Sequence, residues 1–442
     1  MSDVIKEHDT QLLKKCVEDI APALLLKDIF DCITERELDK VIVGEIESRK
    51  TIFLCAMGCL VQNCNTASYN LLVNDLAGAG KDYITAKTLS LMPEFRYLKR
   101  TRISPTVFTY WHNSKWEPGW TWDGKVLYLE DISNGVLNSP VFKVMCSSGS
   151  MATIVKDQRA IDIIIQGKPV MIVTMAHANP TPELVRRFSI VNLDSGIKQT
   201  ENIVKRHLSF AKEGKSPKLD NMFFDALQNL VPIKVKIPYA ELIGQYIPSD
   251  NIIMRTHILR FLDYIKASTA LYQYQREIDE EGYHIATEQD YSIARIALLK
   301  TTSNQYMIPL TKDQRRILEK FKDLPGEWYS VGDLEPKINW LSDKWLREQL
   351  DRLVEYGLLM KDNQTNENSN RKQMVYCFVE NKIAELPEKL IYSSDIATFP
   401  MELTQPQKIK SDDSLKVNNS KDKTVVELIE HKELDKGVIQ IE

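Results

Sequence analysis

The feature that most constrains this 442-residue chain is a loop of small residues set between an apolar run and a helical pattern. Leu71 to Val73 form the apolar run, Gly78 and Gly80 break it, and a helical pattern resumes after Lys81. Backbone N–H groups of such a loop turn toward a phosphate chain, and the helix N-terminus and Lys81 add positive charge. The order strand, glycine loop, helix therefore predicts a phosphate-binding site.

The loop departs from the usual pattern G-x-x-x-x-G-K-[ST] at two positions. Asp75 replaces the first glycine, and Asp82 replaces the final hydroxyl residue. A carboxylate can hold Mg²⁺ through oxygen, but it adds negative charge beside the phosphates, so binding without turnover stays open. Alone, the loop also fits an ordinary glycine-rich turn. The residues expected to contact nucleotide are Ala77, Gly78, Ala79, Gly80, Lys81, Asp82 and Tyr83.

Composition narrows the class of protein. Hydrophobic residues make up 43% and charged residues 27%, which is typical of a soluble globular protein. The net charge of −4 means that any grip on nucleic acid needs local basic patches. The 7 cysteines form no C-x-x-C pair, which suits a reducing compartment. Without a long apolar run or an apolar N-terminal core, we expect a cytoplasmic protein with no membrane contact.

A second candidate site lies at the end of the predicted strand 125–131, KVLYLED, which closes on Glu130 and Asp131. A nucleotide-hydrolysing sheet needs one acid to organise Mg²⁺ and another to orient or deprotonate water. Many strands end in an acid by chance, so the pair alone leaves both readings open. The later strand 169–175, PVMIVTM, runs on to Asn179, and Arg186 and Arg187 follow on a short helix.

Between these strands, residues 151–166 alternate in polarity and are rich in β-branched side chains. This pattern predicts a β-hairpin whose turn, at 157–160, presents Lys156 and Arg159. A plain surface hairpin with solvated charges is the alternative. We also expect a helical entry segment at 8–36 and a helix from Glu45 to Leu60 before the loop.

The sequence pattern of the C-terminal half changes twice, from a helical region to a mixed helix-and-strand region and then to a polar tail. Residues 200–300 are mostly helical in pattern, and 312–378 read as helix, strand, helix, helix, strand, strand, which is the order of a winged helix. The third of those helices starts at Ser342, a good N-cap. Residues 405–423 are polar and poor in aromatics, which predicts disorder. A short amphipathic piece at 425–429 fits a docking helix or nothing.

The order of all these elements resembles the AAA+ ATPases, and within them the minichromosome-maintenance-like helicases and their relatives on phage and plasmid elements. The resemblance covers roughly residues 38–380. It rests on VIVGE at 41–45, on Glu130-Asp131 as Walker B acids in inverted order, on AHANP as a sensor-1 strand end and on Arg187-Phe188 as an arginine-finger pair. Residues 267–291 are similar to the lid helices of mobile-element members.

The resemblance implies an α/β fold: a P-loop AAA+ core with a helical lid, followed by a winged-helix domain. We expect an N-terminal helical segment at 1–37, the nucleotide-binding core at 38–200, the lid at 201–305, the winged helix at 306–382, and a largely disordered tail at 383–442 that includes the short amphipathic piece.

The same resemblance implies a ring, usually a hexamer, that binds ATP and Mg²⁺ at each subunit boundary. Lys81 would contact the β- and γ-phosphates, and Glu130 would hold Mg²⁺, with Asp82 as a second ligand. Asp131 would polarise the attacking water, which Asn179 would help to place. These roles follow the chemistry of phosphoryl transfer, in which positioning and charge neutralisation dominate.

Three arginines receive roles from the resemblance. Arg187, with Arg186 as the alternative, would reach the γ-phosphate of the neighbouring subunit, because a cation supplied from outside neutralises charge that develops during transfer. Arg295 in the lid is a candidate second sensor.

DNA contacts are expected at two places. The hairpin occupies the position of a pore loop, so Lys156 and Arg159 would track a phosphate backbone in a salt-dependent, sequence-independent way. The winged helix would bind duplex DNA, although acidic residues dilute its third helix and many winged helices bind protein instead. Its candidate contacts are Lys344, Arg347, Arg352, Arg371 and Lys372.

These inferences lead to one expected function with two rivals. The first is an ATP-dependent DNA helicase or translocase in DNA replication, with single-stranded and duplex DNA, further copies of the chain and replication proteins reached through the tail as partners. The second is a nucleotide-switched DNA-binding regulator or loader with slow or no hydrolysis, which Asp82 favours. The third is a scaffold that has lost its chemistry.

Overall fold

The computed structural model describes residues 21–75, 78–113, 115–147, 149–156, 158–176, 187–214, 216–247, 254–303, 311–324, 328–355, 358–365, 372–378 and 386–390. Several sequence-based expectations lie outside these residues. They concern the entry helix before residue 21, the tail after residue 390, the side chain of Lys156, and Ala77, Asn179, Arg186 and Arg371.

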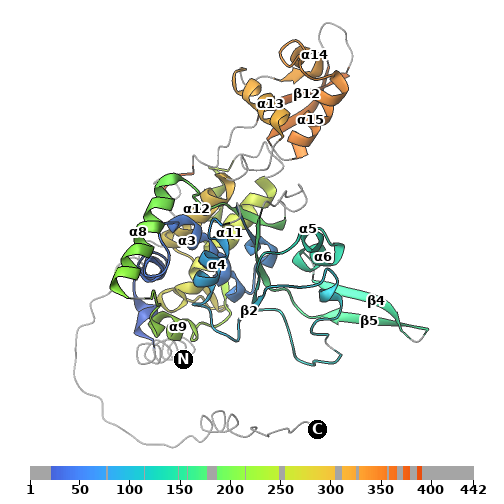
Figure 1. Ribbon diagram of the computed structural model, residues 1–442. Coiled ribbons are helices and arrows are strands. Elements are labelled where there is room, and N and C mark those ends of the chain that lie inside the picture. The colour runs from blue at the N-terminus through green and yellow to red at the C-terminus, as the bar shows by residue number, and fades with distance from the viewer. Residues whose placement is uncertain are drawn as a thin grey trace, which may run out of the picture. The chain divides into compact units, whose positions relative to one another are not determined.

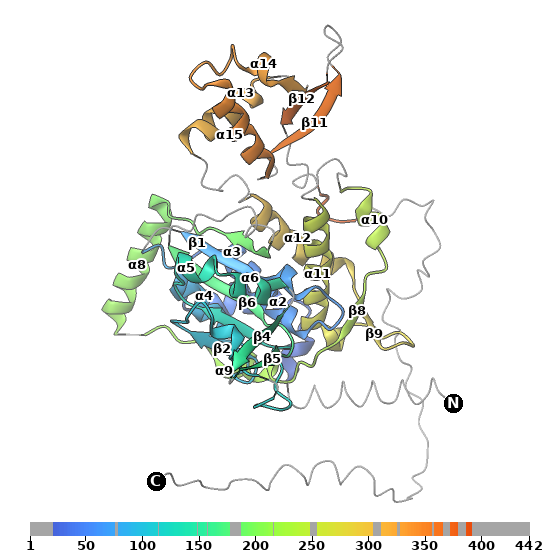
Figure 2. The same ribbon diagram turned by 90° about the vertical axis from the view of Figure 1, so that its right-hand side faces the viewer.

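The centre of the fold is a five-stranded sheet in the order β2-β3-β6-β1-β7, with every neighbouring pair parallel (Figure 2). Because the strands are parallel, their carboxyl ends meet at one edge. Strand β6 lies between β1 and β3, so it separates the strand that leads into the glycine loop from the strand that ends in acids. The bounds are β1 Leu71–Asp75, β2 Tyr97–Arg100, β3 Val126–Leu129, β6 Val170–Ala176 and β7 Ser189–Val191.

Both faces of this sheet are buried, and the strand sequences show why. Successive side chains of a strand point to opposite faces. Leu71 and Val73 belong to one hydrophobic cluster, whereas Leu72 belongs to another, and β3 and β6 alternate in the same way. The near-continuous apolar runs at 71–73, 126–129 and 170–173 are therefore what a parallel sheet covered on two sides requires.

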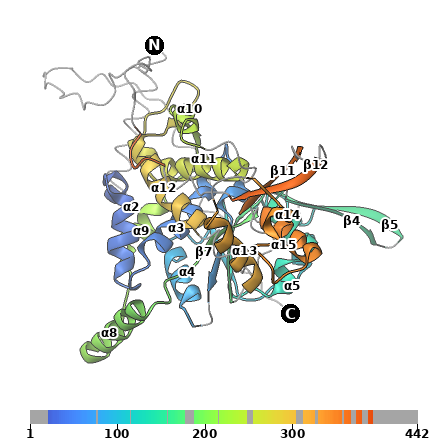
Figure 3. The same ribbon diagram turned by 90° about the horizontal axis from the view of Figure 1, so that it is seen from above.

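Helices from distant parts of the chain cover the first face. Four of them pack against one another, α3 Ile46–Met57, α4 Lys81–Leu89, α11 Met254–Leu271 and α12 Glu288–Ser303 (Figure 3). Helices α9 Asn221–Leu227 and α10 Ala240–Gly244 and the parallel pair β8 Lys234–Lys236 and β9 Tyr283–Ile285 complete the predicted lid region, with α8 Ile197–Glu213 before them. The short parallel ladder was not expected from the helical pattern.

The second face carries shorter elements. Helices α5 Asn134–Leu137 and α6 Pro140–Ser147 pack there with the buried rings of Phe108 and Trp122. The antiparallel hairpin β4 Ser150–Lys156 and β5 Arg159–Ile165 extends from this side, as expected from its alternating sequence (Figure 1). The part of the entry segment that the structure describes is less regular than a single helix: a 3-10 turn Pro22–Leu25, α2 Ile29–Asp31 and a π-helical turn Cys32–Glu37.

Residues 311–378 form elements with a core of their own. They are α13 Lys312–Lys322, β10 Tyr329–Ser330, α14 Val331–Leu334, α15 Asp343–Glu355, β11 Leu359–Thr365 and β12 Lys372–Phe378, and the strands pair antiparallel in the order β10-β12-β11. Thr311 and Gln314 cap α13 reciprocally. The order of elements is the one read from the sequence.

The sequence placed residues 386–390 in the tail, and the structure corrects this. Leu386 and Leu390 are buried in the core cluster of α11 and α12. The Tyr291 hydroxyl donates to the carbonyl of Pro387 at 2.7 Å, and Arg295 Nε donates to the carbonyl of Leu386 at 2.8 Å. Two leucines four residues apart cover apolar surface of α12, so this stretch is part of the fold.

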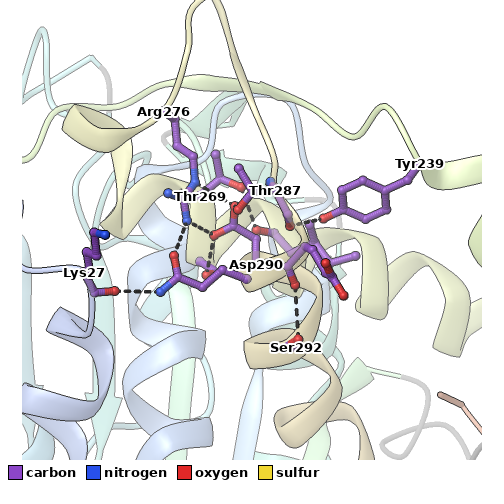
Figure 4. Close-up of polar contacts among 11 residues, drawn as sticks. Lys27, Tyr239, Thr269, Arg276, Thr287, Asp290 and Ser292 are labelled. Carbon is purple, nitrogen blue, oxygen red and sulfur yellow. Dashed lines mark hydrogen bonds and ion pairs between the residues drawn. The ribbon is translucent and has the colours of Figure 1, made fainter. Parts of the chain in front are cut away.

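A buried ion pair fixes the connection between α11 and α12 (Figure 4). Arg276 Nε and Nη2 donate to the two oxygens of Asp290 at 2.8 and 2.9 Å, and both side chains are almost fully buried. Ser268 and the backbone and hydroxyl of Thr287 also donate to this carboxylate. The neighbouring Gln289 donates to the carbonyl of Lys27, which ties the entry segment to the same place.

Replacing Asp290 by alanine should destabilise the core by about 3–5 kcal/mol, because it leaves the Arg276 guanidinium buried without its partner. As a matched control, Glu348→Ala removes a half-exposed pair with Arg352, where the distance is 2.7 Å and the expected change is below about 1 kcal/mol. Thermal unfolding of both variants tests this. Equal shifts in the two unfolding midpoints would contradict it.

Candidate functional site

The glycine loop after β1 has the backbone that its sequence demands. Gly78 and Gly80 have φ values of 87° and 84°, in the left-handed region that favours glycine. A Cβ on either would meet nothing within 4 Å, so the requirement comes from backbone conformation and not from space. Helix α4 begins directly afterwards, at Lys81. The loop therefore leads into a helix N-terminus, where backbone N–H groups without an acceptor inside the helix can bind an anion.

Lys81 and Asp82 form the cationic and anionic parts of this loop. Lys81 is only 5% exposed, and its Nζ lies 3.5 Å from Asp82 Oδ2. The Asp82 side chain keeps 35% exposure, so solvent and ligands reach it. Tyr83, the next residue, donates its hydroxyl to the carbonyl of Val41 at 3.0 Å and so joins α4 to the VIVGE segment.

Asp75, which replaces the first glycine of the pattern, has a structural partner. Its Oδ2 accepts a hydrogen bond from the Leu193 N–H at 3.0 Å, just beyond β7. Asp75, at the end of β1, thus holds the chain segment that follows the neighbouring strand β7.

The two acids after β3 differ in their surroundings. Glu130 Oε2 lies 2.8 Å from Lys99 Nζ, which comes from the neighbouring strand β2, and the Glu130 side chain is 23% exposed. Asp131 is exposed and has a positive φ of 46°. Its backbone N–H donates to Thr174 Oγ1 at 2.9 Å. One acid is therefore paired with a cation, and the other is presented to solvent on a constrained backbone.

Thr174 joins the loop to the acids, and it was absent from the residues expected at the site. It is fully buried on β6, where its hydroxyl donates to Asp82 Oδ1 and accepts from the Asp131 N–H. A lone hydroxyl inside the apolar run PVMIVTM was the signal that the sequence offered. Its partners were hidden because they depend on the strand order.

The carboxylates of Asp82 and Glu130 both act on the buried hydroxyl of Tyr128. Burial raises the pKa of the Tyr128 hydroxyl, a contact with Thr174 opposes the rise, and the charges of Asp82 and Glu130 add to it. Carboxylates such as Asp82, in the first turn of α4, and Glu130, after β3, are oxygen ligands of the kind that Mg²⁺ uses together with substrate phosphates. Within the described ranges, no group of three or more His, Cys, Asp or Glu side chains suited to a metal ion occurs.

Two of the predicted arginines, Arg187 and Arg295, have hydrogen-bond partners inside this chain. Arg187 is half-buried, and its Nε donates to Ser147 Oγ at 2.7 Å, at the end of α6. Phe188, which follows it, stacks on Phe142 with ring centroids 6.1 Å apart. Arg295 Nε is engaged by the Leu386 carbonyl, 2.8 Å away.

The hairpin presents Arg159 at the start of β5, exposed and opposite Lys156 in the ladder. Gln158 in the turn has a φ of 61°. At the base, Ile163 and Ile165 are buried, and Ile165 forms a β-bridge with Asn113. The hairpin thus has an anchored base and an exposed outer part.

In residues 311–378, Lys344 and Arg347 of α15 and Lys372 of β12 are exposed. Arg352 is held by Glu348 on the same helix at 2.7 Å, so part of its charge is neutralised.

Residues 27–232 match a family model described as the MTBMA_p00010 P-loop domain. The matched range contains the whole five-stranded sheet, the glycine loop and the acids after β3. The chain thus contains a P-loop domain with an α/β fold, and the loop before Lys81 lies within the matched range. A search of curated proteins returns no match. In the part of the chain that the structure describes, no helix has both the length and the apolar character to cross a bilayer.

Replacing Thr174 by valine should weaken Mg²⁺-dependent nucleotide binding about five- to thirtyfold, the range for the loss of one or both of its side-chain contacts. The change keeps the shape of the side chain but leaves the Asp131 N–H without its acceptor and Asp82 without its donor, each contact being of order 1 kcal/mol. Titration with a fluorescent ATP analogue, with and without Mg²⁺, measures the effect. Thr174→Ser is the control and should bind like the wild type; a serine variant as weak as the valine variant would refute the role of the hydroxyl.

Proposed function

We propose that this chain is an AAA+ ATPase that moves along DNA as a replicative helicase or translocase. The observation that carries the proposal is the position of the hairpin. Strands β4 and β5 are inserted between the acid-bearing β3 and the central β6, in the same domain that carries the phosphate loop. A hairpin that exposes Arg159 and is joined directly to these strands would move when the nucleotide state of the site changes.

The AAA+ assignment is supported by the separation of the loop strand β1 from the acid strand β3 by one strand, β6. It is supported further by the match between the element order and the order that suggested the resemblance. The helical region from α8 to α12 would be the lid.

In this proposal Lys81 binds the β- and γ-phosphates, and Asp82 and Glu130 hold Mg²⁺. The metal would neutralise phosphate charge. Glu130 must first exchange its partner Lys99, which lies 2.8 Å away. Asp131 is exposed and fixed through its backbone by Thr174, which suits the task of polarising an attacking water. Asn179 would help to place that water.

The proposal includes a ring of identical subunits, hexameric by resemblance, with ATP at each boundary. Arg187, or Arg186 in its place, would approach the γ-phosphate of the neighbouring subunit. The hydrogen bond from Nε to Ser147 would set the plane of the Arg187 guanidinium and so aid its positioning. Arg295 would act as a second sensor through its Nη groups, while its Nε donates to the Leu386 carbonyl.

We propose in addition that residues 311–378 are a winged helix that contacts duplex DNA through α15 and the β11–β12 wing. Lys344, Arg347 and Lys372 are exposed and fit this role best, with Arg371 beside them in the sequence. The pairing of Arg352 with Glu348 makes it a weaker contact. The tail after residue 390 would recruit other replication proteins.

Steady-state ATP hydrolysis with Mg²⁺, with and without single-stranded DNA, tests the proposal. We expect DNA to stimulate the wild type, and Asp131→Asn to lower the stimulated rate about 10²- to 10⁴-fold while nucleotide still binds, because the water loses its general base. Asp225→Asn, an exposed acid on α9, is the matched control and should hydrolyse normally.

The alternative is a nucleotide-switched DNA-binding regulator or loader, and the observation that favours it is the carboxylate of Asp82 lying 3.5 Å from the Lys81 ammonium. That negative charge would compete with phosphate for the lysine. Tight ATP binding without turnover in the wild type, together with a sequence-specific footprint and no strand separation, would select this alternative and reject the motor.

The winged-helix proposal predicts a change in salt dependence. Removing two phosphate contacts by the double change Lys344→Ala and Arg347→Ala should lower the slope of log K against log salt for duplex DNA by about 1.8. Arg352→Ala should change the slope much less, because Glu348 already offsets that charge. Identical slopes for all three proteins, measured by fluorescence anisotropy, would argue for a protein partner at this surface.

A further inference from the structure

The segment between β2 and β3 forms a hollow of about 500 Å³ that none of the roles above uses. This volume lies in the range of ligand sites. Its walls combine two cations, two aromatic rings and three hydroxyl groups, and no acidic residue lines it. The polar and aromatic residues of this arginine-aromatic pocket are Arg100, Arg102, Ser104, Thr106, Tyr110 and Trp111.

The cations of this pocket are available to an anion. Arg102 is exposed, and its side chain makes no hydrogen bond or ion pair with the residues that the structure describes. Arg100 is also exposed; its Nη1 donates to the Lys99 carbonyl at 2.7 Å, and its guanidinium lies 5.4 Å from the centre of the Trp111 ring. Two guanidinium groups without a facing carboxylate suit phosphate oxygens, which arginine binds with its planar fork.

The aromatic wall is rigid on its inner side and open on its outer side. Trp111 packs against the fully buried Phe108 and Trp122, with ring centroids 5.7 and 5.0 Å away. Tyr110 is 55% exposed, so its ring is accessible to a ligand. An exposed ring beside exposed arginine side chains is the arrangement on which unpaired bases stack.

We propose that the arginine-aromatic pocket binds one nucleotide unit of a single-stranded nucleic acid, with a base stacked on Tyr110 and the adjoining phosphate on Arg100 and Arg102. This inference rests on the proposed function, and it locates a binding site for the strand outside the hairpin.

The pocket and the hairpin rest on one hydrophobic cluster, so a single nucleic-acid strand could contact both. Asn113 forms a β-bridge with Ile165, and the backbone N–H of Trp122 donates to the Gln166 carbonyl at 2.9 Å. Phe108, Trp122, Ile163 and Ile165 are buried in the same cluster. A strand that follows Arg159 along the hairpin therefore reaches a pocket built on the same support.

The pocket is also adjacent to the nucleotide site. Lys99, which pairs with Glu130 at 2.8 Å, is the residue before Arg100 on β2. If Glu130 releases Lys99 when nucleotide and Mg²⁺ bind, the end of β2 changes its electrostatic surroundings next to the pocket. Strand binding should therefore depend on the nucleotide state.

Binding of a fluorescein-labelled oligothymidylate to the full chain, measured by anisotropy over a range of salt, tests the proposal. Tyr110→Ala should weaken binding between about fivefold and a hundredfold, the range found for the loss of one stacked base. Tyr110→Phe should bind like the wild type because it keeps the ring. Arg102→Ala should lower the salt slope by about 0.7, the value for one phosphate contact on a single strand.

Matched controls come from the same segment. Trp116→Ala and Lys115→Ala remove an exposed ring and an exposed cation that do not line the pocket, and they should bind like the wild type. Tyr110→Ala binding as tightly as these controls would overturn the proposal. So would equal competition by polyglutamate at the same charge concentration, because it would show that the pocket takes acidic chains without bases.

The outcomes separate this proposal from the function on which it rests. Loss of binding in Arg159→Ala but not in the pocket variants would leave the DNA motor standing and reject the pocket. A wild type that binds no oligonucleotide would reject both. Oligouridylate in place of oligothymidylate shows whether the strand is DNA or RNA, and equal loss for both in Tyr110→Ala supports stacking as the common cause.

Discussion

The buried hydroxyl of Thr174 is the contact on which the geometry of the nucleotide site depends. It lies on the strand between the phosphate loop and the acids, and it binds Asp82 on one side and the Asp131 backbone on the other. A hydroxyl can do both because it donates one hydrogen and still accepts another. The loop lacks its usual hydroxyl residue at position 82, and the bridge shows how a neighbouring strand holds the carboxylate found there.

Three candidate functional elements lie around the carboxyl ends of the parallel strands: the phosphate loop, the acids after β3 and the arginine-aromatic pocket. The phosphate loop follows β1, the acids follow β3, and the end of β2 supplies Lys99 to the acids and Arg100 to the arginine-aromatic pocket. The hairpin adds a fourth element, because its base packs with the segment that forms the pocket. Under the proposals above, neighbouring residues of β2 would serve nucleotide chemistry and strand binding, and this placement would couple the two.

Local patterns carried most of what the sequence revealed. The loop, the acid-ending strand, the hairpin from residue 151 and the element order of 312–378 each depend on spacing within a short window, and the structure has them. The contacts of Thr174, the partner of Asp75 and the pair between Lys99 and Glu130 depend on which strands are neighbours, and no short window contains that information. The packing of residues 386–390 was missed for the same reason, since its partner helix α12 lies far earlier in the chain.

The chain is attached to α12 both before and after residues 311–378, and this double attachment has a consequence. Residues 311–378 leave the core after Ser303, at the end of α12, and the chain comes back to the same helix through Leu386. The connecting stretches 304–310 and 379–385 each span at most about 25 Å when fully extended. Two attachments to one helix therefore limit how far residues 311–378 can extend from α12.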